Sequence, residues 1–432
     1  MSDFLPTKPY RGTRDFLPEE MSIRTQVFST LYRTIETFGF QRYDGPVLEP
    51  VEIYEAKSGQ ELVEKQLYVL TDKADRRLAL RPEMTPSVAR MIAANAGRLQ
   101  FPVRWYSHPN CHRYEKPQKG RVREHWQVNV DVFGSESVEA EVEVFEVVHA
   151  LLGALGADPS TYELRVNDRQ LAMSALERFV GVTPEQQKPV FTVLDRWEKL
   201  PREVCLEQLA AIGLDDAAVE RVAAFTTLDV DGFLDAAAPE ARDASAVARI
   251  LREDLLDAPL KLDPLIVRGL DYYTSTVFEV FDVSPENRRS IFGGGRYDNL
   301  TALFSKQRIP GIGFGMGDVT LIDFLTVHGL LPAAEVAPQV VVLGADETLR
   351  GPIKRTAATL RAAGVRTVVP LETQGLGKAL KKVAKQGARL AVIVGAEEHA
   401  RGAVILRDLA RSEQREVEVA ALTDEVLATL AR

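Results

Sequence analysis

The chain contains little cysteine and no long apolar run. Its two cysteines, Cys111 and Cys205, lie far apart in the sequence, so they provide neither a disulfide framework nor the spacing of a zinc site. No uninterrupted apolar stretch approaches the roughly 20 residues that span a bilayer. Residues 1–10 lack the charged flank and apolar run of a signal peptide. These absences predict a cytoplasmic protein without a membrane segment.

Basic residues are fewer than acidic ones. The chain has 53 Lys and Arg against 62 Asp and Glu, a formal net charge of -9, which argues against a general nucleic-acid coat protein. Residues 338–432 differ, because their 15 Lys and Arg exceed their 11 Asp and Glu. A mildly basic C-terminal unit suits contact with a polyanion, although ordinary variation over 95 residues explains the excess equally well.

The length of 432 residues is too great for one compact core, so two or three domains are expected. Residues 21–38 have the apolar spacing of a helix that ends at Gly39. Residues from about 170 to 257 are rich in Ala, Leu and Glu and are predicted to be mainly helical. A proline-bounded linker is predicted at 330–338. Residues 339–432 then alternate short apolar strands with helices, as in a small α/β domain.

Alternation along residues 126–133 predicts a strand with two unlike faces. Gln127, Asn129 and Asp131 would lie on one face, and that polar face suggests a surface lined for a ligand. The opposite face would carry Trp126, Val128, Val130 and Val132. Before this strand, the polar loop 115–124 forms the strongly basic tip of a predicted hairpin.

Three later segments place polar residues or glycines where strands are expected. Residues 268–274 read Arg-Gly-Leu-Asp-Tyr-Tyr-Thr and lead into the β-branched and aromatic run 276–281. Core strands rarely begin with an arginine, a carboxylate and two phenols unless something polar binds there. Residues 293–298 read Gly-Gly-Gly-Arg-Tyr-Asp, and residues 311–317 read Gly-Ile-Gly-Phe-Gly-Met-Gly. The last run is not a Walker loop, because no Gly-Lys-Ser/Thr follows it.

Two earlier segments combine arginine with glutamate. Residues 80–85 read Leu-Arg-Pro-Glu-Met-Thr, which taken alone is a turn with exposed charges. Residues 111–115 read Cys-His-Arg-Tyr-Glu and precede the basic loop, which taken alone is a solvated hairpin tip. Arginine suits phosphate because its planar group makes two parallel hydrogen bonds and stays charged.

Taken together, these segments resemble those of the histidyl-tRNA synthetases, which are class II aminoacyl-tRNA synthetases. The resemblance implies an α+β catalytic domain with an antiparallel sheet over residues 1–329, with the helical insertion at about 170–257. After the linker 330–338, residues 339–432 would form an α/β anticodon-binding domain. Residues 46–49, Pro-Val-Leu-Glu, look like motif 1 of this class, which implies a homodimer.

The resemblance also implies roles for individual residues. Arg113 and Arg268 would be the catalytic pair that flanks the α-phosphate of ATP. The histidine-binding residues would be Glu83, Thr85, Gln127, Asp131 (many bacterial members have Glu here), Tyr272, Tyr273 and Tyr297. The ATP-binding residues would be Arg113, Glu115, Arg121, Arg268, Gly315 and Gly317. The tRNA acceptor end would contact Gln118, Lys119 and Arg123. Mg²⁺ would accompany the pyrophosphate, with no protein ligand assigned to it.

One position departs from the family pattern. Class II enzymes carry an arginine in motif 3 that holds the γ-phosphate, and Thr320 occupies that position here. The implied reaction is the ATP-dependent charging of tRNA-His through a histidyl-adenylate. Two alternatives stay open: a histidine-binding paralogue that serves as the regulatory subunit of ATP phosphoribosyltransferase, and a related ligase that acts on another carrier. The missing arginine favours the regulator, whereas the predicted C-terminal domain favours the synthetase.

Overall fold

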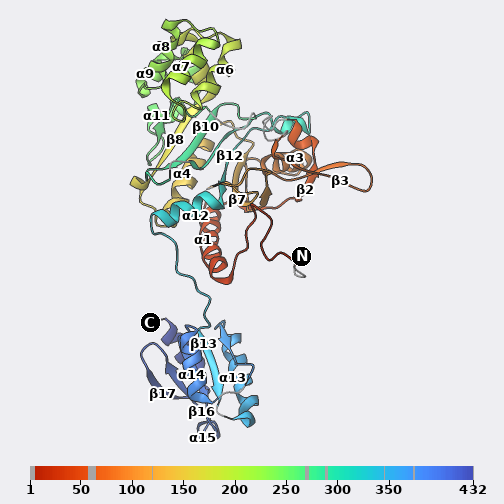
Figure 1. The fold of residues 1–432 in the computed structure, drawn as a ribbon, viewed down its shortest axis with the longest axis vertical. Coiled ribbons are helices and arrows are strands. Elements are labelled where there is room, and N and C mark those ends of the chain that lie inside the picture. The colour runs from red at the N-terminus through yellow and green to blue at the C-terminus, as the bar shows by residue number, and fades with distance from the viewer. Residues whose placement is uncertain are drawn as a thin grey trace. The chain divides into compact units, whose positions relative to one another are not determined.

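The computed structural model describes residues 5–56, 65–118, 120–267, 272–287, 290–344, 346–372 and 375–431. The chain divides into two compact units (Figure 1). The larger unit contains residues 1–17 and 23–333, and the smaller contains residues 18–22 and 334–432. Two predicted site residues, Lys119 and Arg268, lie outside the described residues.

A mostly antiparallel sheet of nine strands organises the larger unit. Its strands follow the order β1-β5-β7-β12-β11-β10-β8-β9, and β6 also pairs with β7. Within this sheet, the described residues form two parallel pairs, β1–β5 and β8–β9. The strands are β1 (Gln41–Arg42), β5 (Val103–Ser107), β6 (Asn110–His112), β7 (Glu124–Phe133), β8 (Tyr162–Asp168), β9 (Lys261–Leu262), β10 (Thr276–Asp282), β11 (Ser290–Arg296) and β12 (Gly311–Gly317).

Three helices cover one face of this sheet, here called the back face. They are α1 (Pro18–Thr37), α4 (Glu139–Ala154) and α12 (Asp318–Val327). Val128, Val130 and Val132 of β7 pack there in one apolar cluster with residues of all three helices. Burial of such a cluster is the main favourable contribution to folding. The opposite, front face carries Gln127, Asn129 and Asp131, because successive side chains of a strand point to opposite faces.

The larger unit also contains a second, smaller sheet of three strands. Its strands are β2 (Leu48–Pro50), β3 (Tyr68–Thr71) and β4 (Arg77–Leu80), in the order β2-β4-β3. The short helix α2 (Glu52–Glu55) follows β2, and α3 (Thr85–Asn95) follows β4. Residues 81–84 therefore connect β4 to α3, which brings Glu83 and Thr85 to the start of that helix.

A helical segment interrupts the main sheet between β8 and β10. It contains α5 (Arg169–Ala175), a π-helical turn (Leu176–Val180), α6 (Pro184–Leu194), α7 (Arg202–Ala211), α8 (Asp216–Phe225), α9 (Val230–Ala236), α10 (Pro239–Ala244) and α11 (Ala246–Glu253). These helices have an apolar cluster of their own. At their base, Asp168 accepts hydrogen bonds from the first turn of α5 and from the Ser245 hydroxyl at 2.8 Å.

The smaller unit is a five-stranded sheet with helices on both faces. Its strands follow the order β14-β13-β15-β16-β17. The elements are β13 (Val340–Gly344), α13 (Arg350–Ala362), β14 (Thr367–Val368), α14 (Leu376–Lys385), β15 (Leu390–Val394), α15 (Ala396–Ala400), β16 (Ala403–Asp408), β17 (Glu413–Glu418) and α16 (Leu422–Leu430). A short 3-10 helix in this unit occupies Glu347–Leu349, and two others in the larger unit occupy Pro159–Thr161 and Thr301–Leu303. Among the described residues, no helix is long and apolar enough to cross a membrane.

Candidate active site

The front face of the main sheet is hollowed by glycines. Gln127, Asn129 and Asp131 of β7 lie directly opposite Gly317, Gly315 and Gly313 of β12. A Cβ atom at Gly315 would lie 1.6 Å from Gln127 Nε2, and one at Gly313 would lie 2.4 Å from Asp131 Oδ1. Side chains on β12 would therefore fill the space into which the polar side chains of β7 point. This register confirms the predicted polar face.

Asp131 is a buried carboxylate with one oxygen available. Only 1% of the residue is exposed, and the Tyr297 hydroxyl donates a hydrogen bond to its Oδ1. Its Oδ2 has no hydrogen-bond partner among the described residues. Burial raises the pKa of Asp131 to about 7, although the bond from Tyr297 opposes this. A ligand N–H group would satisfy the free oxygen.

A second buried carboxylate, Glu83, lies on the other side of a tyrosine cluster. The Tyr272 hydroxyl donates to Glu83 Oε2 at 2.8 Å, and Glu83 is 2% exposed. The rings of Tyr272 and Tyr273 meet edge to face at 5.0 Å, and those of Tyr272 and Tyr297 at 5.9 Å. Burial first, then the charges of Glu83 and Asp131, raise the pKa of the Tyr273 phenol. Both carboxylates thus border one cluster of tyrosines.

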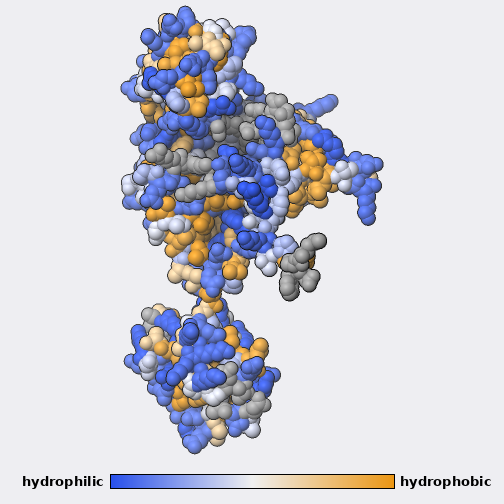
Figure 2. Space-filling view, viewed as in Figure 1, coloured by the Kyte–Doolittle hydropathy of each residue, from blue (hydrophilic) through white to orange (hydrophobic). Residues whose placement is uncertain are grey.

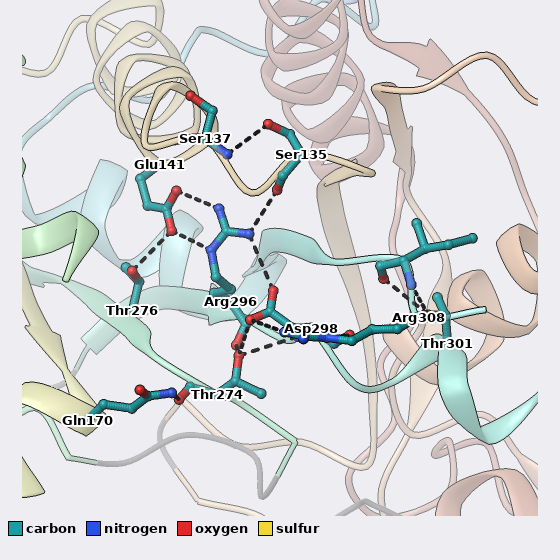
Figure 3. Close-up of polar contacts among 11 residues, drawn as sticks. Ser135, Ser137, Glu141, Gln170, Thr274, Thr276, Arg296, Asp298, Thr301 and Arg308 are labelled. Carbon is teal, nitrogen blue, oxygen red and sulfur yellow. Dashed lines mark hydrogen bonds and ion pairs between the residues drawn. The ribbon is translucent and has the colours of Figure 1, made fainter. Parts of the chain in front are cut away.

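A buried ion pair holds the strand that carries Tyr297 (Figure 3). Arg296 Nε and Nη2 each donate to Glu141 of α4 at 2.5 Å, and Arg296 Nη1 donates to the Ser135 carbonyl at 3.0 Å. The side chains of Arg296 and Glu141 are 8% and 0% exposed. Because Arg296 precedes Tyr297, this pair fixes the backbone from which the phenol reaches Asp131.

The same network reaches the other pocket tyrosines. The Thr274 hydroxyl donates to Asp298 Oδ2 at 3.0 Å, and the Thr274 N–H donates to the Arg296 carbonyl at 2.8 Å. Thr274 directly follows Tyr273, and Asp298 directly follows Tyr297. The two segments that supply the tyrosines are thus joined to each other, as Figure 3 shows for the side chains of Thr274 and Asp298.

An arginine-bearing cavity of about 200 Å³ lies beside the last glycine of β12. Its lining includes predicted ATP-binding residues and is formed by Arg113, Glu115, Gly120, Arg121, Val122, His125, Gly317, Val319 and Thr320. Arg113 Nε donates to the Pro82 carbonyl at 3.0 Å, which connects this cavity to the segment that carries Glu83. Gly315, also predicted to bind ATP, instead faces Gln127. A larger cleft of about 990 Å³ shares Gly120, Arg121 and Thr320 and extends to the helical segment at Leu194 and Lys199.

His125 is a cavity residue that sequence reasoning missed. It lies near the start of β7, and its ring is largely buried. Burial, together with the charge of Arg113, lowers its pKa to about 3, so the imidazole stays neutral at physiological pH. A neutral ring beside a fixed arginine offers a flat surface for a nucleotide base. The only signal in the sequence is its place directly after the basic loop.

The residues predicted to contact the tRNA acceptor end lie in and beside the basic loop. Gln118 and Arg121 form an isolated β-bridge. Arg123 Nε donates to the Glu115 carbonyl at 3.0 Å, and its guanidinium lies 4.3 Å from the centre of the Tyr114 ring. Arg123 Nη1 also donates to the Tyr10 hydroxyl at 2.5 Å, so both the loop and the N-terminal segment hold this side chain.

The motif 3 position has no cation. The Thr320 hydroxyl donates to the Ile291 carbonyl at 2.5 Å, so it connects α12 to β11. Two residues earlier, the buried Asp318 accepts from Arg14 Nη2 at 2.9 Å and from Arg24 Nη1 at 2.5 Å. The start of α12 therefore ties the N-terminal segment and α1 to the sheet.

A mostly antiparallel sheet that buries two carboxylates on its front face beside an arginine-lined cavity, accompanied by an α/β unit, is the arrangement of a class II aminoacyl-tRNA synthetase. The model of the family "Histidyl-tRNA synthetase" matches residues 12–319, and that of "Anticodon binding domain" matches residues 339–429. The chain belongs to the histidyl-tRNA synthetase family. The predicted family and fold class are confirmed.

Similar proteins cover nearly the whole chain. A histidine--tRNA ligase of Leptospira biflexa is 40% identical over 95% of this chain and 95% of its own length. One of Pyrococcus furiosus is 37% identical over 95% of this chain and 96% of its own length. The crystal structure of histidyl-tRNA synthetase from Nostoc sp. PCC 7120 has a TM-score of 0.83 and 26% identity, covering 99% of this chain and 100% of that one.

Proposed function

We propose that this chain is a histidine--tRNA ligase, the activity named for its full-length relatives. It activates histidine with ATP and transfers it to the 3' end of tRNA-His. The observation that carries the proposal for the site is the pair of buried carboxylates, Glu83 and Asp131, on either side of the tyrosine cluster. An amino acid with two separate N–H-bearing groups matches such a pair.

Histidine would bind with its ammonium group at Glu83 and its imidazole at Asp131. Charge-assisted hydrogen bonds from an ammonium to a carboxylate are strong, and Thr85 stands beside Glu83 at the start of α3. The free Asp131 Oδ2 would accept the imidazole N–H, with Tyr297 and Gln127 nearby. Analogues without that N–H would leave a buried carboxylate unpaired, which is costly.

Adenylate formation needs no general base at this site, because the attacking histidine carboxylate is already ionised. Its oxygen would form a bond to the α-phosphorus of ATP while pyrophosphate leaves. Arg113 and Arg268 would neutralise the charge that builds on the phosphate, which is the main electrostatic task of such a site. The terminal tRNA hydroxyl would then attack the activated carbonyl and release AMP.

The nucleotide would occupy the cavity of about 200 Å³ that Arg113, Glu115 and Arg121 line. The described residues contain no group of three His, Cys, Asp or Glu that could hold a metal ion. Any Mg²⁺ would therefore be held mainly by the phosphates of ATP, as is usual for this ion. No step above depends on it.

The regulatory alternative is disfavoured. The matched anticodon-binding domain at residues 339–429 gives the chain a part that a histidine-sensing regulator does not need. Thr320 alone supports that alternative, and Arg113 together with the basic loop weighs against it.

We propose the domain boundaries that the sequence predicts. The catalytic domain would occupy residues 1–329 with the insertion at about 170–257, the linker would occupy 330–338, and the anticodon-binding domain would occupy 339–432. The natural place for tRNA charging is the cytoplasm.

We also propose a homodimer formed through the small sheet. Leu48 and Leu70 are 45% and 46% exposed, and the register of β2, β4 and β3 places them on the same face of this sheet. Figure 2 shows hydrophobic residues gathered on this part of the larger unit. Contiguous exposed apolar side chains are typical of interfaces between subunits. Sedimentation of the wild type and of Leu48→Asp with Leu70→Asp tests this proposal, and a monomeric wild type would refute it.

Charging of tRNA tests the function itself. Purified protein with labelled histidine, ATP and tRNA-His is expected to form acid-stable histidyl-tRNA, and other amino acids are expected to give none. A chain that ends at Ala337 should still activate histidine but charge poorly. Bound histidine without activation would indicate the regulator, and activation without charging of any tRNA would indicate another carrier.

A further inference from the structure

One helix of the smaller unit has two unlike sides. Helix α14 packs on one face of the five-stranded sheet, where Ala379 and Val383 are buried against Val341, Leu343 and Ala391. Helices α13 and α16 belong to the apolar cluster of the other face. The outer side of α14 therefore faces solvent with no other described helix of this cluster beside it.

Four lysines form a stripe along that outer side. They occupy positions i, i+3, i+4 and i+7, a spacing that places side chains on one face of a helix. All four are exposed, and the first to the last span about 10 Å at 1.5 Å per residue. Figure 2 shows hydrophilic side chains gathered where α14 lies in Figure 1. The lysine stripe consists of Lys378, Lys381, Lys382 and Lys385.

Within the described part of the chain, the lysine stripe has no acidic partner. None of its side chains makes an ion pair or hydrogen bond with another described residue. No Asp or Glu occurs in residues 373–396. Two arginines of the same unit differ, since Arg401 pairs with Glu416 at 3.2 Å and Arg389 donates to the Leu430 carbonyl at 2.7 Å. Partners are thus available in this unit, but not at the stripe.

This arrangement opposes the stability of the helix. Like charges four residues apart repel each other on a helix, and both Lys378–Lys382 and Lys381–Lys385 have that spacing. The helix dipole disfavours Lys378 in the first turn but favours Lys382 and Lys385 in the last turn, so the repulsion between the lysines is the cost that remains. Solubility does not account for the stripe, because the whole chain already carries a net charge of -9. A polyanion that binds along α14 would offset this repulsion.

We infer that the lysine stripe binds the phosphate backbone of tRNA. This inference rests on the proposed function, because the polyanion available to an aminoacyl-tRNA synthetase is its tRNA. The unit is basic, whereas the rest of the chain has a net charge of -13, the difference between -9 and +4. Lysine acts as a point charge toward phosphate, and phosphate contacts position a nucleic acid without reading its bases.

Two double variants of the full chain provide the test. Lys381→Gln with Lys382→Gln neutralises the middle of the stripe. Lys354→Gln with Arg355→Gln removes the same charge from two exposed residues of α13, which belongs to the opposite face of the sheet. Lys381→Arg with Lys382→Arg keeps the charge. For each protein, the KM for tRNA-His in charging is measured from 50 to 200 mM KCl, and histidine activation is measured without tRNA.

The stripe variant should raise the KM for tRNA about tenfold and reduce the slope of log KM against log salt by about one unit for each lysine. The variant Lys381→Arg with Lys382→Arg and the α13 variant should behave like the wild type. Histidine activation without tRNA should be unchanged in all of the variants. A stripe variant with wild-type KM and salt slope would refute the inference. Equal loss in the α13 variant would also refute it, because net charge rather than position would then explain the effect. A wild type that charges no tRNA would refute the proposed function instead.

Discussion

The two faces of the main sheet differ although the same strands form both. In β7, Val128, Val130 and Val132 alternate with residues whose polar side chains point to the front. The back face packs its valines against three helices, and each contact there stabilises the fold. The front face instead buries Asp131 and leaves room opposite it, where Gly313 replaces a side chain. The back of the sheet contributes stability, and the front contributes the site.

Buried atoms without partners show the cost of the front face. Among the described residues, Asn129 Oδ1 and Asp131 Oδ2 are buried with no hydrogen-bond partner. Each such atom costs about 1–3 kcal/mol. Burial, followed by the charge of Asp131, raises the pKa of the Tyr43 phenol, and its interaction with the Ser107 hydroxyl opposes this. A polar ligand on this face would recover part of that cost.

The largest effect is expected behind the pocket, at Arg296. Arg296→Ala leaves Glu141 buried and unpaired, which should lower the free energy of unfolding by about 3–5 kcal/mol. Urea denaturation measures the loss. Arg308→Ala is the matched control, because Arg308 contacts Asp298 at 3.5 Å but is 55% exposed, so about 0–1 kcal/mol is expected. Equal effects of the two substitutions would contradict the structural role of the buried pair.

On the front face, Asp131→Asn should act on binding and on stability in opposite directions. Loss of the charged acceptor should weaken histidine binding by about 2–3 kcal/mol, roughly 30- to 150-fold. Without histidine, the variant should be more stable than the wild type, since a buried charge is removed. Calorimetric titration and denaturation measure the two effects, and ATP binding serves as the control. A variant that binds histidine normally would show that the imidazole lies elsewhere.

Adding one methyl group to each face should separate the two roles. A Cβ at Gly294, on the back face, would lie 2.1 Å from the Gly313 carbonyl oxygen, so Gly294→Ala should destabilise the fold by about 1–3 kcal/mol. A Cβ at Gly315 meets the end of the flexible Gln127 side chain. Gly315→Ala should therefore displace Gln127, raise the KM for histidine and change stability by less than about 1 kcal/mol. If Gly294→Ala instead changed the KM for histidine and Gly315→Ala destabilised the fold, the two faces would have been assigned wrongly.

The last prediction concerns the dependence of stability on pH. Burial raises the pKa of Asp131 to about 7. Below about pH 4 the carboxyl is protonated in both the folded and the unfolded protein, so it does not change the free energy of unfolding. As pH rises to 7 it lowers the free energy of unfolding progressively, and above 7 this loss is complete. The stability advantage of Asp131→Asn without histidine should increase by about 1 kcal/mol per pH unit over that interval. A difference that is constant from pH 4 to 8 would indicate an ordinary pKa for Asp131.

Much of the fold was accessible from the sequence, because the relevant strands carry strong periodic signals. The alternation of β7 gave both of its faces, and the α/β pattern of the smaller unit gave most of its elements. Strand β17 (Glu413–Glu418) was missed because five of its six residues are exposed and polar. The small sheet β2-β4-β3 was also missed, since its short strands show no alternation that a sequence pattern could detect.

The site was accessible only in part. The motif-bearing segments predicted Glu83, Asp131 and Tyr297 as site residues, but not the hydrogen bonds that the structure shows for them. His125 was missed because a single histidine at the start of a strand carries no spacing signal. The roles of Asp318 and Thr320 in holding α12 also depend on contacts between residues that lie far apart in the chain. Such contacts follow from tertiary packing and not from local pattern.

Histidine-dependent exchange of pyrophosphate into ATP tests the central claim most directly. It requires the front face to bind histidine and the arginine-lined cavity to support chemistry without a motif 3 arginine. Exchange that is specific for histidine and is reduced in Asp131→Asn is the predicted result. No exchange by the wild type, with histidine still bound in a calorimeter, would contradict the account and identify the front face as a sensor of histidine.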